Sequence, residues 1–303
     1  MDALRPSPPA AEARAAAAPR PADPEPRPAP TAREAPVPGR ARRVWLWGEM
    51  MLLYFVVPAV IALLIDPNGW ANRALGAVGL ASPLELPVRS RAVVFPALFA
   101  FTALTLTWLL LDRSFDRRRL WNWRGARGDL PRVFLLWLAG VLLTFWLAVL
   151  AMDHLRHMLP PGRDDLLFSF PRRSPLGWTI VMLAYPVLSA YLQEITHRAF
   201  WFHRYGRLFG LPTAPTPTPT PAPLGRGGWT AVAVNAVAFM WLHVVMWNWV
   251  ALALTLPGGI LFAWTYLRTR STLAAGLEHA LYGNWLFTVG LGWFLFTGSV
   301  GAS

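Results

Sequence analysis

The chain has 303 residues, of which 55% are hydrophobic and only 15% are charged, a balance that excludes an ordinary soluble domain and favours several membrane spans. It contains no cysteine, which excludes disulfides, thiolate catalysis and zinc–thiolate sites. The net charge of +12 does not require a nucleic-acid partner, and none is expected, because basic residues that flank apolar spans commonly fix the cytoplasmic side of a membrane protein.

The first 42 residues are rich in Pro, Ala and Arg and contain almost no large apolar side chain. Such a segment cannot bury enough apolar surface to fold, so residues 1–42 are predicted to be a disordered cytoplasmic tail. No apolar core follows within the first 30 residues, which argues against a cleaved signal peptide.

Apolar windows long enough to cross a bilayer as helices, about 20 residues each, recur through the rest of the chain. They lie at residues 44–65, 92–111, 133–152, 176–195, 229–248 and 249–267. Residues 271–298 have room for one or two further helices. The sequence therefore predicts an all-α fold, a polytopic transmembrane helical bundle of about seven or eight helices.

The connections between these windows carry clustered arginines. Residues 112–132 contain seven of them, and two further clusters follow the fourth and sixth windows. All of them fall on one side if the N-terminus is cytoplasmic, which predicts that orientation, in a bacterial plasma membrane. Residues 212–223, PTAPTPTPTPAP, predict an extended Pro-rich loop.

Polar and ionisable side chains gather near the ends of three late apolar windows, where they are costly unless paired and usually mark function. They are Gln193, Glu194, His197 and Arg198 in YLQEITHRAF, His243 in FMWLHVVMWNW, and Glu278 with His279 in LEHALYGNW. Three separate spans therefore contribute polar residues.

Within the first of these groups, residues four apart share a helix face. Glu194 and Arg198 are spaced for an ion pair with the Glu N-terminal, which is the favourable order. Gln193 and His197 form a second stripe, about 100° around the helix. The ion pair can be a structural anchor or part of a catalytic site, and His197 can be an interfacial residue or a catalytic one.

The other two groups each contain a histidine. His243 lies four residues after Phe239 in an apolar wall, where a neutral imidazole can be a base, a metal ligand or a satisfied core residue. Glu278 and His279 are adjacent and point about 100° apart on a helix, so only one of them is expected to face a given site.

The order and spacing of these groups resemble the motifs of the CPBP family, the CAAX-processing and bacteriocin-processing intramembrane proteases. The family motifs EExxxR, FxxxH and HxxxN stand here as Gln193, Glu194 and Arg198; Phe239 and His243; and His279, with Gly283 in the Asn position and Asn284 one residue later. The resemblance covers about residues 176–290. Residues 176–298 are therefore assigned to a CPBP-like protease core, and residues 43–175 to N-terminal transmembrane helices.

The resemblance implies a helical membrane protease whose site lies in an internal cavity open to the cytoplasm. In the family, the first Glu of EExxxR and the His of FxxxH activate a water molecule, while the last His and the Asn stabilise the oxyanion. Carried over, His243 becomes the partner base, His279 an oxyanion donor, and Glu194 with Arg198 the second Glu and its Arg. The implied substrate is a peptide bond in a membrane-associated or lipidated protein, and no cofactor is implied.

Gln193 occupies the position of the family's first Glu. An amide can orient a water molecule but cannot accept its proton, so the base must come from elsewhere. The alternatives are Glu194, Glu278, His197 and His243 alone. We favour an active variant site, because an inactive relative has no need to keep His243, His279 and Arg198.

The late Asn has two explanations. A π-bulge after His279 would return Asn284 to the face of the imidazole, and Gly283 would ease that distortion. Alternatively, the phenol of Tyr282 supplies the second oxyanion donor.

Two other classes of protein fit the same residues. Loss of the first Glu is compatible with a catalytically inactive CPBP-like membrane scaffold. A zinc-dependent membrane hydrolase would use His197, His243, His279 and Glu194, since Glu194 and His197 form an E-x-x-H pair like those of di-metal bundles. Zinc is thus the one cofactor that the sequence leaves open.

Overall fold

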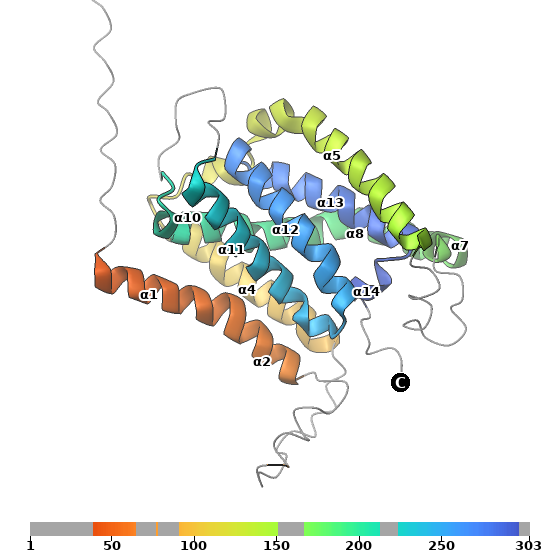
Figure 1. The fold of residues 1–303 in the computed structure, drawn as a ribbon, viewed down its shortest axis with the longest axis horizontal. Helices are drawn as coiled ribbons and strands as arrows, with labels where there is room; N and C mark the ends of the chain where they lie inside the picture. The colour runs from red at the N-terminus through yellow and green to blue at the C-terminus, as the bar shows by residue number, and fades with distance from the viewer. Residues whose placement is uncertain (1–38, 65–76, 78–90, 151–166, 213–223, 297–303) are drawn as a thin grey trace, which may run out of the picture. The chain divides into compact units, whose positions relative to one another are not determined.

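A computed structural model of the protein describes residues 39–64, 77, 91–150, 167–212 and 224–296. Within these ranges every regular element is helical, which confirms the all-α prediction (Figure 1). The predicted tail lies outside the described residues up to residue 38, and the Pro-rich loop lies outside them from residue 213. The first helix begins at Arg40, slightly before the first predicted window.

Most helices follow the predicted windows. The first window is α1 (Arg40–Met51), a π-helical turn (Leu52–Val56) and α2 (Val57–Leu64). The middle of the chain holds α4 (Arg91–Leu111), α5 (Trp123–Leu150) and the short α7 (Ser169–Arg173). The last helices are α11 (Arg226–Leu242), α12 (Trp249–Thr269), α13 (Thr272–Val289) and α14 (Trp293–Phe296).

One continuous helical stretch runs from residue 175 to residue 209, well past the predicted end at residue 195. Its parts are α8 (Pro175–Tyr185), a π-helical turn (Pro186–Tyr191), α9 (Leu192–Glu194), a second π-helical turn (Ile195–Phe200), α10 (Trp201–Tyr205) and a 3-10 turn (Gly206–Phe209). The helix continues because Trp201 and Tyr205 are fully buried, so core packing extends beyond the polar motif. The motif therefore lies inside a helix and not at its end.

The two π-helical turns lie on either side of Gln193 and Glu194, and the second of them contains Arg198. Pro186 begins the first of them, because its ring nitrogen cannot donate the hydrogen bond that an α-helix needs and its ring crowds the preceding turn. Such turns are rare and occur frequently at functional sites. They rotate and widen the helix at the point where Gln193 and Glu194 face other helices.

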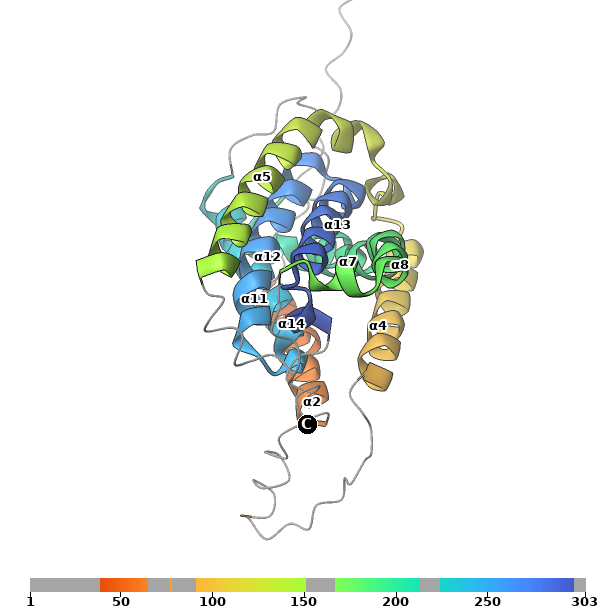
Figure 2. The same cartoon turned by 90° about the vertical axis from the view of Figure 1, so that its right-hand side faces the viewer.

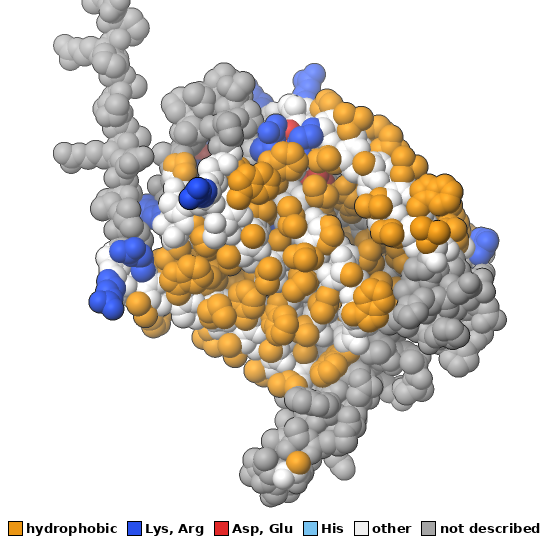
Figure 3. All heavy atoms as spheres, viewed as in Figure 1, with side chains coloured by type: hydrophobic (Ala, Val, Ile, Leu, Met, Phe, Trp, Pro, Cys, Tyr) orange, Lys and Arg blue, Asp and Glu red, His pale blue; other side chains and the backbone are white. Residues whose placement is uncertain are grey.

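Five helical segments within the described ranges are long and apolar enough to cross a membrane: Arg40–Leu63, Arg117–Leu150, Pro175–Phe209, Arg226–Met246 and Trp249–Thr269. Apolar side chains cover much of the visible face (Figure 3), and those of Leu135, Leu143 and Leu150 on α5 are largely exposed. An apolar surface of this extent suits lipid and not water. The chain is thus an integral membrane protein, while the number of seven or eight helices stays a prediction.

Helix α13 lies among the other motif-bearing helices. It contacts α5, α12 and the π-helical turn Pro186–Tyr191, and α11 packs along α12 (Figures 1 and 2). The ring of Phe239 on α11 lies 5.4 Å from the ring of His197 and 5.4 Å from that of His279, measured between centroids. The three sequence motifs therefore meet in the interior of the bundle.

Helix α1 is tied to α10 by a polar contact near the end of the long helix. The guanidinium of Arg204 donates to both carboxylate oxygens of Glu49 at 2.8 and 2.6 Å, and the hydroxyl of Tyr205 donates to the same carboxylate at 2.9 Å. This ion pair is partly solvent-exposed, in contrast to the one inside the site.

Gly259 sets the distance between α11 and α12. A Cβ at this position would lie 3.0 Å from the Cα of Ala236, closer than packed side chains allow without movement of the backbone. We expect Gly259→Ala to lower the free energy of unfolding in detergent by about 1–3 kcal/mol through overpacking. Gly48→Ala is the matched control, because nothing lies within 4 Å of a Cβ there and Ala favours a helix over Gly. Equal stability of the two variants would contradict this close packing.

Candidate active site

A pocket of about 1000 Å³ opens between α4, α5, α8, α12 and α13. Its wall is mainly apolar, with side chains such as Leu98, Leu143 and Phe262. Polar side chains converge on it from the three motifs and from the residues just before the first one: Tyr185, Ser189, Gln193, His243 and His279. A mainly apolar pocket with a few convergent polar groups is the usual form of a ligand or active site.

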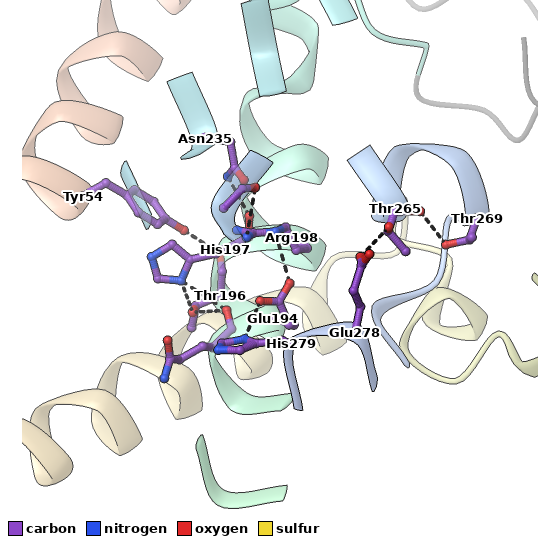
Figure 4. A network of polar contacts seen from close by, with 12 residues as sticks. Tyr54, Glu194, Thr196, His197, Arg198, Asn235, Thr265, Thr269, Glu278 and His279 are labelled. Carbon is purple, nitrogen blue, oxygen red and sulfur yellow. Dashed lines mark hydrogen bonds and ion pairs between the residues drawn. The ribbon is translucent and has the colours of Figure 1, made fainter. Parts of the chain in front are cut away.

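The carboxylate of Glu194 joins the long helix to α13 (Figure 4). One oxygen, Oε1, lies 2.9 Å from Nδ1 of His279, and the other, Oε2, lies 3.1 Å from Nε of Arg198. Both Glu194 and Arg198 are 0% exposed. The predicted Glu194–Arg198 ion pair is thus confirmed, as an electrostatic contact that lacks the alignment of a hydrogen bond.

Arg198 also lies over aromatic rings. Its guanidinium carbon is 4.9 Å from the centroid of Phe239 and 5.8 Å from that of Phe262. A desolvated cation gains from such ring faces, which partly replace the water it has lost. The Phe of the FxxxH motif therefore supports the Arg of the first motif.

His279 is held at both ring nitrogens. Because Glu194 is paired with a cation and is an acceptor when ionised, we assign the Nδ1 proton of His279 to the bond with Glu194. Its Nε2 lies 3.0 Å from the hydroxyl oxygen of Tyr185. The imidazole is further stacked on the ring of Phe262 with centroids 4.6 Å apart. Its orientation in the pocket is therefore fixed from three sides.

His243 lies directly after α11, where it caps the helix. Its Nδ1 is 2.9 Å from the carbonyl oxygen of Phe239, so Nδ1 carries the proton. A neutral imidazole then keeps an unprotonated Nε2, which has no hydrogen-bond partner among the described residues. His243 lines the pocket, so this lone pair is available for chemistry there.

Gln193 presents an amide to the same pocket. Its Nε2 lies 2.9 Å from the hydroxyl oxygen of Ser189, while its Oε1 is buried without a partner in the part of the chain that the structure describes. A buried carbonyl oxygen without a partner is unfavourable and is commonly satisfied by a bound water molecule. The position of the family's first Glu therefore holds an acceptor with no basicity.

Five of the predicted site residues do not line the pocket: Glu194 and Arg198, which form the buried ion pair, and Glu278, His197 and Asn284. Glu278, proposed as an alternative base, accepts a hydrogen bond from the hydroxyl of Thr265 at 2.5 Å, and Figure 4 shows it directed away from Glu194. His197 is 1% exposed and lies between the rings of Tyr54 and Phe239, so it is enclosed in the protein and not interfacial. Asn284 donates to the carbonyl oxygen of Met182 at 3.2 Å.

The structure supports neither explanation for the position of Asn284, which lies one residue beyond the Asn position of HxxxN. Helix α13 is regular α-helix from Thr272 to Val289, so the π-bulge suggested after His279 is absent. Tyr282 does line the pocket, but its hydroxyl donates to the carbonyl oxygen of Leu136 on α5 at 2.7 Å. Sequence reasoning missed Tyr185, which belongs to no motif. The one signal was Gly283, whose missing side chain leaves room for a neighbour.

One comparison with known proteins identifies a related family. Residues 175–286 match the family described as Type II CAAX prenyl endopeptidase Rce1-like. The CPBP resemblance is confirmed over these residues. We refer to them as the Rce1-like segment. It begins with α8 and includes every residue of the three motifs. No curated protein and no solved structure matches the chain.

The four residues that a zinc-dependent hydrolase would use as ligands, His197, His243, His279 and Glu194, do not form one cluster. Within the described residues, no three His, Asp or Glu side chains are grouped so that they could hold a metal ion. Nδ1 of His197 is occupied by the carbonyl oxygen of Gln193 at 3.1 Å and the hydroxyl of Thr196 at 2.9 Å. Glu194 and His279 are in contact with each other.

The buried ion pair leads to a stability prediction. Glu194→Leu leaves Arg198 buried without its counter-charge, which we expect to lower the free energy of unfolding by roughly 3–5 kcal/mol. The double variant Glu194→Leu/Arg198→Met should recover most of that loss, because no unpaired charge remains. Unfolding in detergent micelles measures both.

The partly exposed pair Glu49–Arg204 is the matched control. The corresponding variants Glu49→Leu and Glu49→Leu/Arg204→Met should differ by about 1 kcal/mol or less, because water stabilises a charge left unpaired there. A Glu194→Leu protein as stable as the wild type would contradict the assigned role of the ion pair.

Proposed function

We propose that this protein is an intramembrane endopeptidase that hydrolyses a peptide bond in a membrane-associated substrate. The observation that carries the proposal is the meeting at one pocket of His243, His279 and Gln193, all three of which belong to the Rce1-like segment. Both imidazoles have Nδ1 bonded to an oxygen acceptor, so each turns Nε2 to other partners. Such tautomer control is what general base catalysis by histidine requires.

His243 is assigned as the base. Its Nε2 removes a proton from a water molecule whose oxygen forms a bond to the carbonyl carbon of the substrate, while the π electrons of that carbonyl move to its oxygen. The imidazolium that results keeps its Nδ1–H bond to the carbonyl oxygen of Phe239. It then returns the proton to the leaving nitrogen as the C–N bond breaks.

Gln193 is assigned as the residue that positions this water molecule. Its unpartnered Oε1 can accept the second hydrogen of the water, and its bond to Ser189 fixes the direction of the amide. This division of work differs from the family's, in which a carboxylate both holds the water and supplies basicity. Here the amide orients and the histidine alone takes the proton.

The substrate class follows from the position of the pocket. Its wall includes apolar side chains of α4 and α5, helices whose outer faces suit lipid, so a peptide or lipid-modified chain held in the membrane fits it. The connection before α5 carries clustered arginines, which supports a cytoplasmic N-terminus in a bacterial plasma membrane. We propose no cofactor for the reaction.

The test compares the wild type with His243→Ala on a library of membrane-tethered peptides in detergent or vesicles. We expect the wild type to cleave at least one peptide and the variant to lose at least 10²-fold in kcat, roughly the contribution of a general base. His203→Ala is the matched control, because His203 is bonded to Asp112 at 3.1 Å and does not line the pocket. If the wild type cleaves no peptide that His243→Ala leaves intact, the scaffold alternative is correct.

A second variant tests the role of Gln193. We expect Gln193→Glu to raise kcat/KM by about 10-fold or more, because a carboxylate at this position adds a base beside the water. The Ser189 hydroxyl, which accepts from the Gln193 amide, can reverse and donate to the carboxylate. The pH profile should gain an acidic limb at which that carboxylate becomes protonated. A rate that falls in Gln193→Glu would show that the water is not held at this residue.

The zinc alternative is separated by a different measurement. Metal analysis of the purified protein, with and without prior chelation, gives the zinc content per chain, and activity is followed in the same samples. Stoichiometric zinc together with loss of cleavage on chelation would replace the His243 mechanism with the metal-dependent one.

A further inference from the structure

Gly283, at the Asn position of HxxxN, lies directly against the ring of Tyr185. A Cβ on Gly283 would overlap Cε1, Cζ and the hydroxyl oxygen of Tyr185. An Asn side chain at this position and the phenol of Tyr185 therefore compete for the same space. Gly283 leaves that space to the phenol, whose oxygen lies 3.0 Å from Nε2 of His279, the residue that begins the motif.

The fold holds Tyr185 in this place. It is the last residue of α8, directly before Pro186 and the π-helical turn. Its ring packs edge-on against Phe287 and His279, with centroids 5.2 and 5.9 Å apart. Because both the phenol and the imidazole line the pocket, the hydroxyl is presented to any carbonyl group that enters.

We propose that the hydroxyl of Tyr185 is the oxyanion donor of this site, in the place of the Asn amide of HxxxN. This inference rests on the proposed peptidase function. His279 donates its Nδ1 proton to Glu194, and its Nε2 accepts from Tyr185, so it has no N–H left for a substrate oxygen. The Tyr185 hydroxyl beside Nε2 is then the hydrogen-bond donor available to a substrate oxygen next to His279.

The resting hydrogen bond explains how the donor is released. Before reaction, the Tyr185 proton points to the neutral Nε2 of His279. When water adds to the substrate carbonyl, the oxygen gains a negative charge, and the hydroxyl turns about its Cζ–O bond to donate to it. A hydrogen bond to an ionised acceptor is roughly twice as strong as one between neutral groups, so the exchange is favoured once charge has developed. Tyr185 keeps its proton throughout, and the hydroxyl returns to Nε2 when the C–N bond breaks.

The other two candidates for this role are occupied. The hydroxyl of Tyr282 donates to Leu136, and the amide of Asn284 donates to Met182. Both acceptors are backbone carbonyl oxygens on neighbouring helices, and neither bond points to His279. The exchange of Asn for Gly283 is therefore compensated by Tyr185 and not by a residue of α13.

The experiment uses the full chain with the substitution Tyr185→Phe, which removes only the hydroxyl. On a peptide that the wild type cleaves, we expect kcat to fall by about 10² to 10³-fold, the effect of losing one oxyanion donor, with KM changed little. Tyr191→Phe is the matched control, because its hydroxyl donates to the carbonyl oxygen of Leu120 at 2.8 Å and its ring does not line the pocket.

A binding measurement gives a readout that does not need turnover. The probe is a membrane-anchored phosphinate peptide, whose P–O⁻ group imitates the oxyanion. We expect Tyr185→Phe to bind it about 10- to 100-fold more weakly than Tyr191→Phe does, the range for one hydrogen bond to a charged group. The double variant Tyr185→Ala/Gly283→Asn, which restores the family's Asn in the space vacated by the phenol, should bind the probe more tightly than Tyr185→Ala.

The outcomes separate this inference from the proposed function. If the wild type and Tyr185→Phe cleave a peptide equally well and His243→Ala does not, the role of Tyr185 is overturned. The proposed peptidase function is then retained. If the wild type cleaves no peptide, the function fails, and weaker binding of the phosphinate by Tyr185→Phe would still support the donor. Equal binding by the two Phe variants, no binding by the wild type, or a double variant no better than Tyr185→Ala would overturn it.

Discussion

The site depends on one buried carboxylate, that of Glu194, which is shared between the cation of Arg198 and the imidazole of His279. A carboxylate with no access to water is stable only beside a positive charge, and the i,i+4 spacing supplies that charge from the same helix. Its second oxygen is then free to accept from α13. The same pairing that neutralises the charge thus positions the last histidine and selects its tautomer.

Two π-helical turns and two glycines at helix contacts provide the space for this arrangement. The π-helical turns on both sides of α9 displace the long helix from regular α geometry where it must present Gln193 to the pocket and Glu194 to α13. Gly283 admits the ring of Tyr185, and Gly259 lets α12 approach α11. In a membrane, where apolar surface gives little drive for helix association, such small residues allow backbones and rings to come close enough for dispersion and hydrogen bonds to hold the bundle.

The two pocket histidines are prepared in the same way by different acceptors. A backbone carbonyl holds Nδ1 of His243, and a carboxylate holds Nδ1 of His279. The carbonyl leaves Nε2 of His243 without a proton and open to the pocket, whereas the carboxylate makes the other imidazole an acceptor for the phenol of Tyr185. Proton removal and oxyanion stabilisation are therefore assigned to different side chains of the pocket, without a carboxylate at the position of Gln193.

Hydrophobic windows and i,i+4 spacing are local properties of the chain, so they were sufficient to predict the helical membrane fold, the positions of most helices and the Glu194–Arg198 pair. The sequence could not determine that the long helix continues beyond residue 195, since that depends on where Trp201 is buried. The contact of Glu278 with Thr265 and the packing of Tyr185 against Gly283 arise only when the helices pack together. Those contacts join helices far apart in the chain, and the direction of each side chain is set by the neighbour it meets.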